Sequence, residues 1–143
     1  MDIKILAVGK IKDAAYSQKI EEYAGRIRHD AKLAIVEIKD SDPESEADRI
    51  LDHCGREQAD VFALDERGKL YSSLEFARVV SAAQRRIIFI IGGPDGLSDR
   101  VKKAARACIA LSPMTFTHEM ARLLLVEQIY RAISILKGRK YHK

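Results

Sequence analysis

Apolar and polar positions along the chain follow two periods. Short stretches dominated by apolar and β-branched residues are typical of buried strands, and they occupy residues 3–8, 33–38, 61–64, 86–91 and 108–111. Between these stretches apolar side chains recur every three or four positions, as with Tyr16, Ile20, Tyr23 and Ile27, which indicates helices with one buried face. Strands that alternate with helices in this way predict an α/β domain with a mainly parallel, five-stranded sheet and helices on both faces.

Residues that cap helices set the expected helix starts. Asp13 and Ser98 stand at N-cap positions, and Asp42 precedes Pro43 at the first helical position. Ser72 is followed three residues later by a glutamate, which is the spacing of a capping box. We therefore expect helices at 13–27, 43–57, 72–83, 98–107 and 119–136, and a turn at 65–68.

The last expected helix, 119–136, is apolar on more than one side. Met120, Leu123, Leu124, Val126 and the run 129–133 exceed a single stripe. A helix that is apolar nearly all round is buried, and at the end of a small chain a second buried face usually needs a partner. This pattern predicts a homodimer through the helix. A helix that lies centrally within one subunit would produce the same pattern.

The composition is typical of one globular domain over residues 1–143, with 47% hydrophobic and 32% charged residues. No apolar run approaches the roughly 18 residues of a membrane helix. The first residues lack the basic segment and cleavage site of a signal peptide, so we expect none. Cys54 and Cys108 are too few for a disulfide framework. We expect a cytoplasmic protein without membrane contact.

Charge is distributed unevenly along the chain. Residues 1–71 carry 12 basic and 16 acidic side chains, whereas residues 72–143 carry 13 basic and 5 acidic ones. A basic half suggests a polyanionic partner such as RNA. Cations near a helix C-terminus, where the helix dipole favours them, would give the same excess without any partner.

Two loops follow expected strands, at the sheet edge where ligands of open parallel sheets gather. Residues 92–96 read Gly-Gly-Pro-Asp-Gly, and the glycines permit a sharp turn and close approach to a ligand. Residues 111–118 mix apolar atoms with hydroxyl groups ahead of a helix, a chemistry that suits a flat heterocycle with polar edges. Dinucleotide, Walker and Gly-x-Ser-x-Gly motifs are missing, and the four histidines lack metal-ligand spacing, so no metal is expected.

Taken in order, these segments resemble the small bacterial 23S rRNA pseudouridine N3-methyltransferases of the SPOUT superfamily. The resemblance covers essentially the whole chain and is strongest from Phe89 onward. The segments that carry it are Phe89–Leu97, Leu111–His118, Arg122, Glu127–Ala132 and Tyr141–Lys143. It implies a C-terminal trefoil knot, a homodimer and S-adenosylmethionine bound in the knot by backbone groups of the loops.

The resemblance also implies which residues contact the cofactor. These are Leu64, Gly92, Gly93, Leu111, Ser112, Pro113, Met114, Thr115, Phe116 and Thr117. The family usually has proline just before the histidine, where this chain has Thr117. Because threonine caps helices, we expect the loop to keep its course with slightly altered geometry.

Methylation of an imide nitrogen requires loss of its proton, so a general base is expected. The candidates are His118, His142 and, with less support, Glu127. His142 together with Tyr141 is favoured, since a terminal segment in a dimer is able to reach the partner's cofactor site. His118 is alternatively a residue that only shapes the cofactor loop.

The resemblance implies a pseudouridine of 23S rRNA as methyl acceptor, and the small size of the chain suggests action on the assembled ribosome. Contacts with RNA are expected from Arg122, Arg131 and Lys143. A ribosome- or RNA-binding module with the same fold and no catalysis is the alternative function. A flavodoxin-type nucleotide-binding protein is a weaker alternative, because no phosphate loop follows the first strand.

Overall fold

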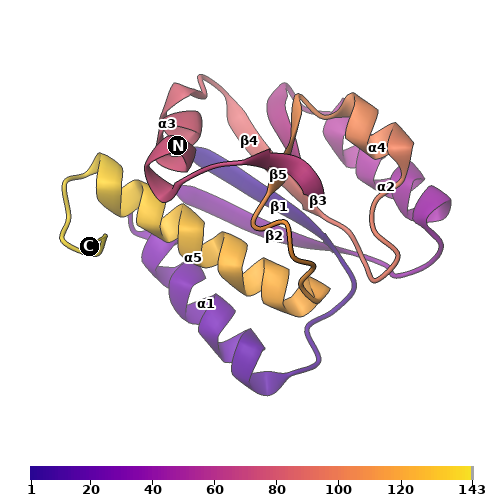
Figure 1. Ribbon diagram of the computed structural model, residues 1–143, viewed down its shortest axis with the longest axis horizontal. Helices are drawn as coiled ribbons and strands as arrows, with labels where there is room; N and C mark the ends of the chain where they lie inside the picture. Colours follow the sequence, from indigo (N-terminus) through magenta and orange to yellow (C-terminus); the bar gives the residue numbers. More distant parts are fainter. Residues whose placement is uncertain (143) are drawn as a thin grey trace.

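The computed structural model describes residues 1–142, in which five strands alternate with five helices (Figure 1). This alternation confirms the predicted α/β class. The elements are β1 (Asp2–Val8), α1 (Ala14–Arg28), β2 (Lys32–Ile38), α2 (Pro43–Gly55), β3 (Ala59–Leu70), α3 (Ser73–Ala82), β4 (Arg86–Ile91), α4 (Asp99–Ala104), β5 (Ala107–Ala110) and α5 (His118–Leu136).

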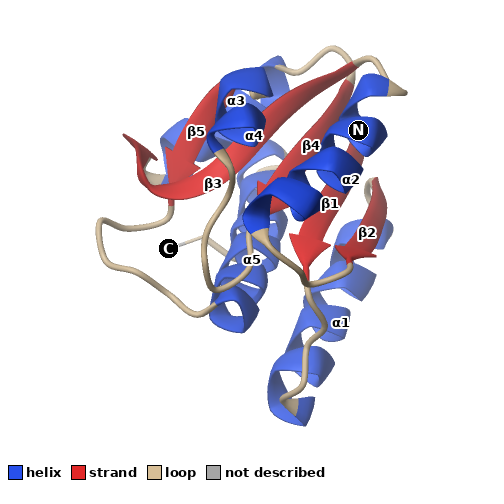
Figure 2. Ribbon diagram, turned by 90° about the vertical axis from the view of Figure 1, so that its right-hand side faces the viewer, coloured by secondary structure: helices blue, strands red, loops and turns tan. Residues whose placement is uncertain are grey.

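The sheet has the strand order β2-β1-β4-β3-β5, and every neighbouring pair is parallel. β4 occupies the centre, which suits its sequence, because residues 87–91 are all apolar and buried. The strands point the same way, so their carboxyl ends meet along one edge of the sheet (Figure 2). That edge is where the loops at 92–96 and 111–118 begin.

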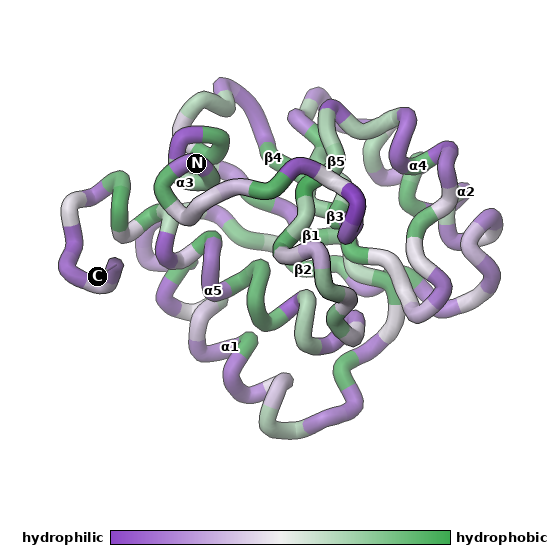
Figure 3. Tube along the Cα trace, in the orientation of Figure 1, coloured by the Kyte–Doolittle hydropathy of each residue, from purple (hydrophilic) through white to green (hydrophobic). Residues whose placement is uncertain are grey.

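Helices cover both faces of the sheet, as predicted. In β1, Ile3 and Ile5 pack into a core shared with α1, α3 and α5. Leu6 and Val8 point to the other face and pack against α2 and α4. The hydropathy of the chain follows this layering, with apolar residues along the central strands and polar ones on the outer turns (Figure 3).

Four predicted caps and the capping box are confirmed. Asp13 and Asp42 accept backbone N–H groups of the first turns of α1 and α2. Ser72 and Glu75 form the reciprocal bonds of a capping box, and Ser98 caps α4. Thr117 accepts the N–H of Met120 at 3.3 Å and is the N-cap of α5, as expected for threonine in place of proline.

The expected turn at 65–68 is wrong as an end to its strand, because β3 continues to Leu70. Both Leu64 and Lys69 pair with Ile109, so the four residues between them bulge out of the ladder. Gly68 makes this bulge possible, since a Cβ there would lie 2.7 Å from the carbonyl carbon of Cys108. The bulge carries Asp65, Glu66 and Arg67 beyond the sheet.

α5 packs between α1 and α3 and buries Leu125, Val126, Ile129 and Ile133 within the chain. Much of its apolar surface is therefore used inside one protomer. Leu123 and Leu124 stay half-buried. The homodimer and the trefoil knot remain predictions.

Candidate functional site

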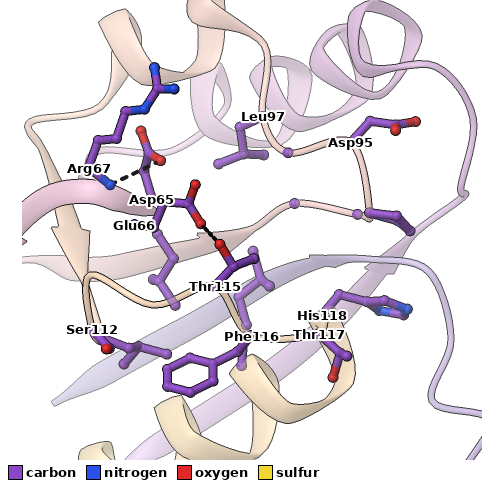
Figure 4. Close-up of a pocket in the computed structure, with 18 of the residues that line it drawn as sticks. Asp65, Glu66, Arg67, Asp95, Leu97, Ser112, Thr115, Phe116, Thr117 and His118 are labelled. Atoms are coloured by element: carbon purple, nitrogen blue, oxygen red, sulfur yellow. Dashed lines mark hydrogen bonds between the residues drawn. The ribbon is translucent and has the colours of Figure 1, made fainter.

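A cleft of about 660 Å³ opens at the carboxyl ends of β3, β4 and β5 (Figure 4). Its walls come from three segments, 64–67, 91–97 and 111–118, together with Lys102 and Ala121. The fold thus brings together both loops that the sequence singled out. Of the expected cofactor contacts, the lining includes Leu64, Gly92, Gly93, Leu111, Ser112 and the run 114–117.

The turn after β4 is tight because its glycines approach one another. A Cβ on Gly92 would lie 2.9 Å from the carbonyl carbon of Gly96, and one on Gly93 would lie 3.1 Å from Cγ1 of Val8. Gly96 has a φ of +76° and donates its N–H to the carbonyl of Gly93 at 3.0 Å. Larger residues at these two positions would displace the turn.

The loop between β5 and α5 presents hydroxyl and backbone groups. Ser112 Oγ accepts the N–H of Met114 at 3.0 Å. Thr115 donates its hydroxyl to Glu66, so the loop is joined to the bulge of β3 across the cleft (Figure 4). Pro113 is exposed and does not line the cleft, although the sequence resemblance includes it among the cofactor contacts.

His118 begins α5 at the floor of the cleft (Figure 4). Its Nδ1 is buried beside Gly9 and forms no hydrogen bond with the described residues. The neighbouring Glu119 accepts the backbone N–H groups of Lys12 and Asp13 at 2.7 and 3.0 Å. These bonds lower the pKa of Glu119 and fix the start of the helix.

The charged side chains of the cleft were not identified from the sequence. Asp65, Glu66 and Arg67 line it from the bulge, and Lys102 lines it from α4. Lys102 Nζ lies 3.2 Å from Asp65 Oδ2. Three consecutive charged residues after a buried strand were the available signal, but an ordinary turn has the same composition.

A second cavity of about 290 Å³ adjoins the cleft, and the two share Leu64, Leu111 and Phe116 in their walls. It lies between α3 and α5 and is mainly apolar, with contributions from Phe76 and Leu124. Polar loops beside an apolar compartment are the combination that binds a flat heterocycle.

The C-terminal residues lie at the opposite end of α5 from the cleft (Figure 1). Tyr141 donates its hydroxyl to Glu127 at 3.0 Å and lies 3.0 Å from the hydroxyl of Tyr23. Burial, reinforced by these bonds, raises the pKa of Tyr141 above its usual value. His142 Nδ1 is 3.3 Å from a guanidinium nitrogen of Arg131. Within one protomer the structure therefore separates Tyr141 and His142 from the cofactor loops.

Arg122, for which an RNA contact is predicted, forms its hydrogen bonds inside the chain. The residue is only 3% exposed, and its guanidinium donates to Glu37 at 2.8 Å and to the carbonyl of Gly9 at 2.9 Å. These two bonds connect α5 to the carboxyl ends of β1 and β2. Arg131 is partly exposed and paired with Glu127 at 2.5 Å. Lys143 lies outside the described residues.

Within residues 1–142, no three His, Cys, Asp or Glu side chains gather as metal ligands would. In the same range, no helix combines the length and the apolar character needed to cross a bilayer.

A parallel α/β sheet with a loop-built cleft at its carboxyl edge defines a protein that binds a small organic ligand there. The backbone groups of the glycine turn and the hydroxyls of residues 112 and 115 suit a ligand with polar edges. A family model described as "Predicted SPOUT methyltransferase" matches residues 1–142. The chain belongs to the SPOUT methyltransferase family and is a methyltransferase, which requires a methyl donor.

Relatives of similar length support this conclusion. A protein of Prochlorococcus marinus named "Ribosomal RNA large subunit methyltransferase H" is 42% identical over 98% of this chain and 94% of its own length. A "Putative ribosomal RNA large subunit methyltransferase H" of Methanoregula boonei is 44% identical over the full length of both. These matches favour the enzyme over the non-catalytic module and the flavodoxin-type protein.

Among solved structures, a probable methylase family protein from Haemophilus influenzae matches with a TM-score of 0.60. The match covers 99% of this chain and 70% of the other at 16% sequence identity. At that identity the likeness shows the fold alone.

Proposed function

We propose that this chain methylates N3 of a pseudouridine in 23S rRNA, with S-adenosylmethionine as donor, and that it acts on the assembled ribosome as a homodimer. The observation that carries the proposal is the meeting of three strand-end segments at one cleft, in a chain of this family. The names of its relatives support ribosomal RNA as the acceptor class.

The loops of the cleft would hold the cofactor, which supplies an already activated methyl group when bound. Backbone groups around Gly92 and Gly93 and the hydroxyls of Ser112 and Thr115 are suited to polar edges. The apolar compartment beside Leu111 is suited to a ring face. The protein's main contribution is then position, which in comparable reactions is worth roughly 7–11 kcal/mol.

The acceptor nitrogen must give up a proton, and His142 with Tyr141 is the proposed group. Tyr141 and His142 contact Glu127 and Arg131, which at 1.5 Å per residue lie about 14–20 Å along α5 from His118 in the cleft. The proposal therefore requires the tail of one protomer to serve the cleft of its partner. His118, inside the cleft, is the competing base.

Binding of the donor is tested by calorimetry with S-adenosylmethionine, and we expect micromolar affinity. Methylation is tested by mass mapping of large-subunit rRNA from cells that lack the gene. One methyl mark on a pseudouridine should disappear and return when the gene is restored. Unchanged marks together with no donor binding would contradict the proposed activity as a whole. Unchanged marks together with tight donor binding would contradict only the proposed acceptor.

The basic second half of the chain should make ribosome binding depend on salt. We expect the logarithm of the affinity to fall with the logarithm of salt concentration, at about 0.7–0.9 per neutralised phosphate. Binding to ribosomal particles in titrated potassium chloride measures this slope. Since so small a chain has little surface for reading RNA alone, free rRNA fragments should be methylated far more slowly than particles. Equal rates, or a flat salt dependence, would contradict this part of the proposal.

A further inference from the structure

The cleft contains a pair of opposite charges that the chemistry above leaves unused. Lys102 Nζ lies 3.2 Å from Asp65 Oδ2, and their side chains are 30% and 17% exposed. Both residues line the cleft. The other charged residues of the lining, Glu66, Arg67 and Asp95, are exposed at its rim (Figure 4). The half-buried pair is therefore the charged feature best shielded from water.

Backbone geometry fixes where this pair stands. Asp65 opens the bulge of β3, whose course is set by the close approach of Gly68 to the backbone of Cys108. The carboxylate of Asp65 also accepts the N–H of Arg67 at 3.4 Å. Lys102 comes from α4, which packs on the sheet through the buried Val101. A ligand thus meets an arrangement that is already formed, which limits the entropy lost on binding.

We propose that Asp65 and Lys102 bind the amino-acid end of the methyl donor. This inference rests on the proposed function, because S-adenosylmethionine carries an α-ammonium and an α-carboxylate on one carbon atom. The Lys102 ammonium donates to the α-carboxylate, and the Asp65 carboxylate accepts from the α-ammonium. The two charges of the side chains and the two charges of the ligand then alternate in sign. Each charged group therefore has a partner of opposite charge when water is excluded.

The division of the cleft agrees with this assignment. The segments 91–93 and 111–112 contribute apolar atoms, backbone groups and a hydroxyl, and they carry no charged side chain. Such a surface suits the uncharged nucleoside end of the donor. The charged end of the same molecule would then lie beside the bulge and α4, where Asp65 and Lys102 are.

Two compounds that share one nucleoside separate this role from general support of the cleft. S-adenosylhomocysteine has the amino-acid end, and 5′-methylthioadenosine lacks it. Calorimetry on the full chain should give a preference of about 10- to 100-fold for S-adenosylhomocysteine, as expected for charge-assisted hydrogen bonds. Lys102→Met and Asp65→Asn should each reduce this preference to about threefold or less. The affinity for 5′-methylthioadenosine should stay within about twofold of wild type.

Lys4→Met is the matched control, because Lys4 forms a comparable half-buried pair with Glu57 and does not line the cleft. It should keep the full preference. Equal losses of affinity for both compounds in the cleft variants, or a preference that survives both changes, would overturn the assignment. A wild-type protein that binds both compounds equally would also overturn it while leaving the donor in place. Failure to bind either compound would remove the proposed donor and this site together.

Discussion

Gly92 directly follows the central strand, and a Cβ atom there would meet the backbone of Gly96 at 2.9 Å. Gly92→Ala should therefore displace the turn that lines the cleft and weaken S-adenosylmethionine binding at least about tenfold by calorimetry. Gly25→Ala is the control, since a Cβ on Gly25 in α1 meets nothing within 4 Å. That change should raise the unfolding free energy by about 0.5–1 kcal/mol without altering binding. Wild-type affinity in Gly92→Ala would show that the turn is not part of the donor site.

An arginine can contact RNA or stabilise the fold from inside, and the sequence alone does not show which role Arg122 has. Its side chain is 4% exposed, so Arg122→Ala would leave Glu37 and the Gly9 carbonyl without their donor. We expect a loss of about 1–3 kcal/mol in unfolding free energy, measured by urea denaturation. Arg56→Ala removes an exposed pair with Asp52 and should stay within about 0.5 kcal/mol. Reduced affinity for RNA in Arg122→Ala at unchanged stability would restore the RNA-binding role.

At the scale of elements, features set by nearby residues were predictable from the sequence, and features set by distant residues were not. The N-caps Asp42 and Ser72 each accept a backbone N–H three positions away, so the nearby sequence is enough to predict them. The bulge at 65–68 depends on pairing with β5, some forty residues later, and on the close approach at Gly68. Lys102 meets Asp65 because α4, which follows β4, packs on the sheet through Val101. The loops of the site were thus predictable, and its charged wall was not.

The ends of α1 and α5 are joined by a carboxylate that should make stability depend on pH. Asp30 accepts two bonds from Arg139 at 2.6 and 2.8 Å and pairs with Lys137 at 3.1 Å. The Arg139 guanidinium, followed by Lys137, holds the pKa of Asp30 well below its usual range. A lowered folded-state pKa gives stability that is complete above the unfolded value of about 3.9 and is lost as pH falls towards the folded value.

Asp30→Asn should consequently lower the melting temperature at pH 7, and its difference from wild type should narrow between about pH 4 and pH 2. Thermal unfolding over that range measures the effect. Asp52→Asn, which removes the exposed pair with Arg56, should behave like wild type throughout. A melting-temperature difference that stays constant across this pH range would mean that the charge of Asp30 does not contribute to stability.

At the scale of the whole molecule, the distance between the cleft and the tail makes the assembly testable. Gly92→Ala damages a cleft, and His142→Asn removes the proposed base from a tail. At a donor concentration that fills the wild-type cleft but not the Gly92→Ala cleft, both homodimers have little activity if each tail serves the partner's cleft. A mixed dimer then has one intact cleft facing one intact tail. Statistical mixing makes half of the dimers mixed, so about a quarter of wild-type methylation should return when the two variants are refolded together.

The same mixture distinguishes the competing arrangements. A tail that served its own cleft would give no recovery, because every cleft in the mixture would lack either its glycine turn or its histidine. If His118 were the base, the His142→Asn variant alone would keep its methylation activity. The mixture would then have only the activity that its His142→Asn protomers contribute. Methylation of ribosomal particles by each variant alone and by the refolded mixture therefore decides between a shared site and a self-contained one, since His118 lies in the cleft and His142 lies outside it beside Arg131.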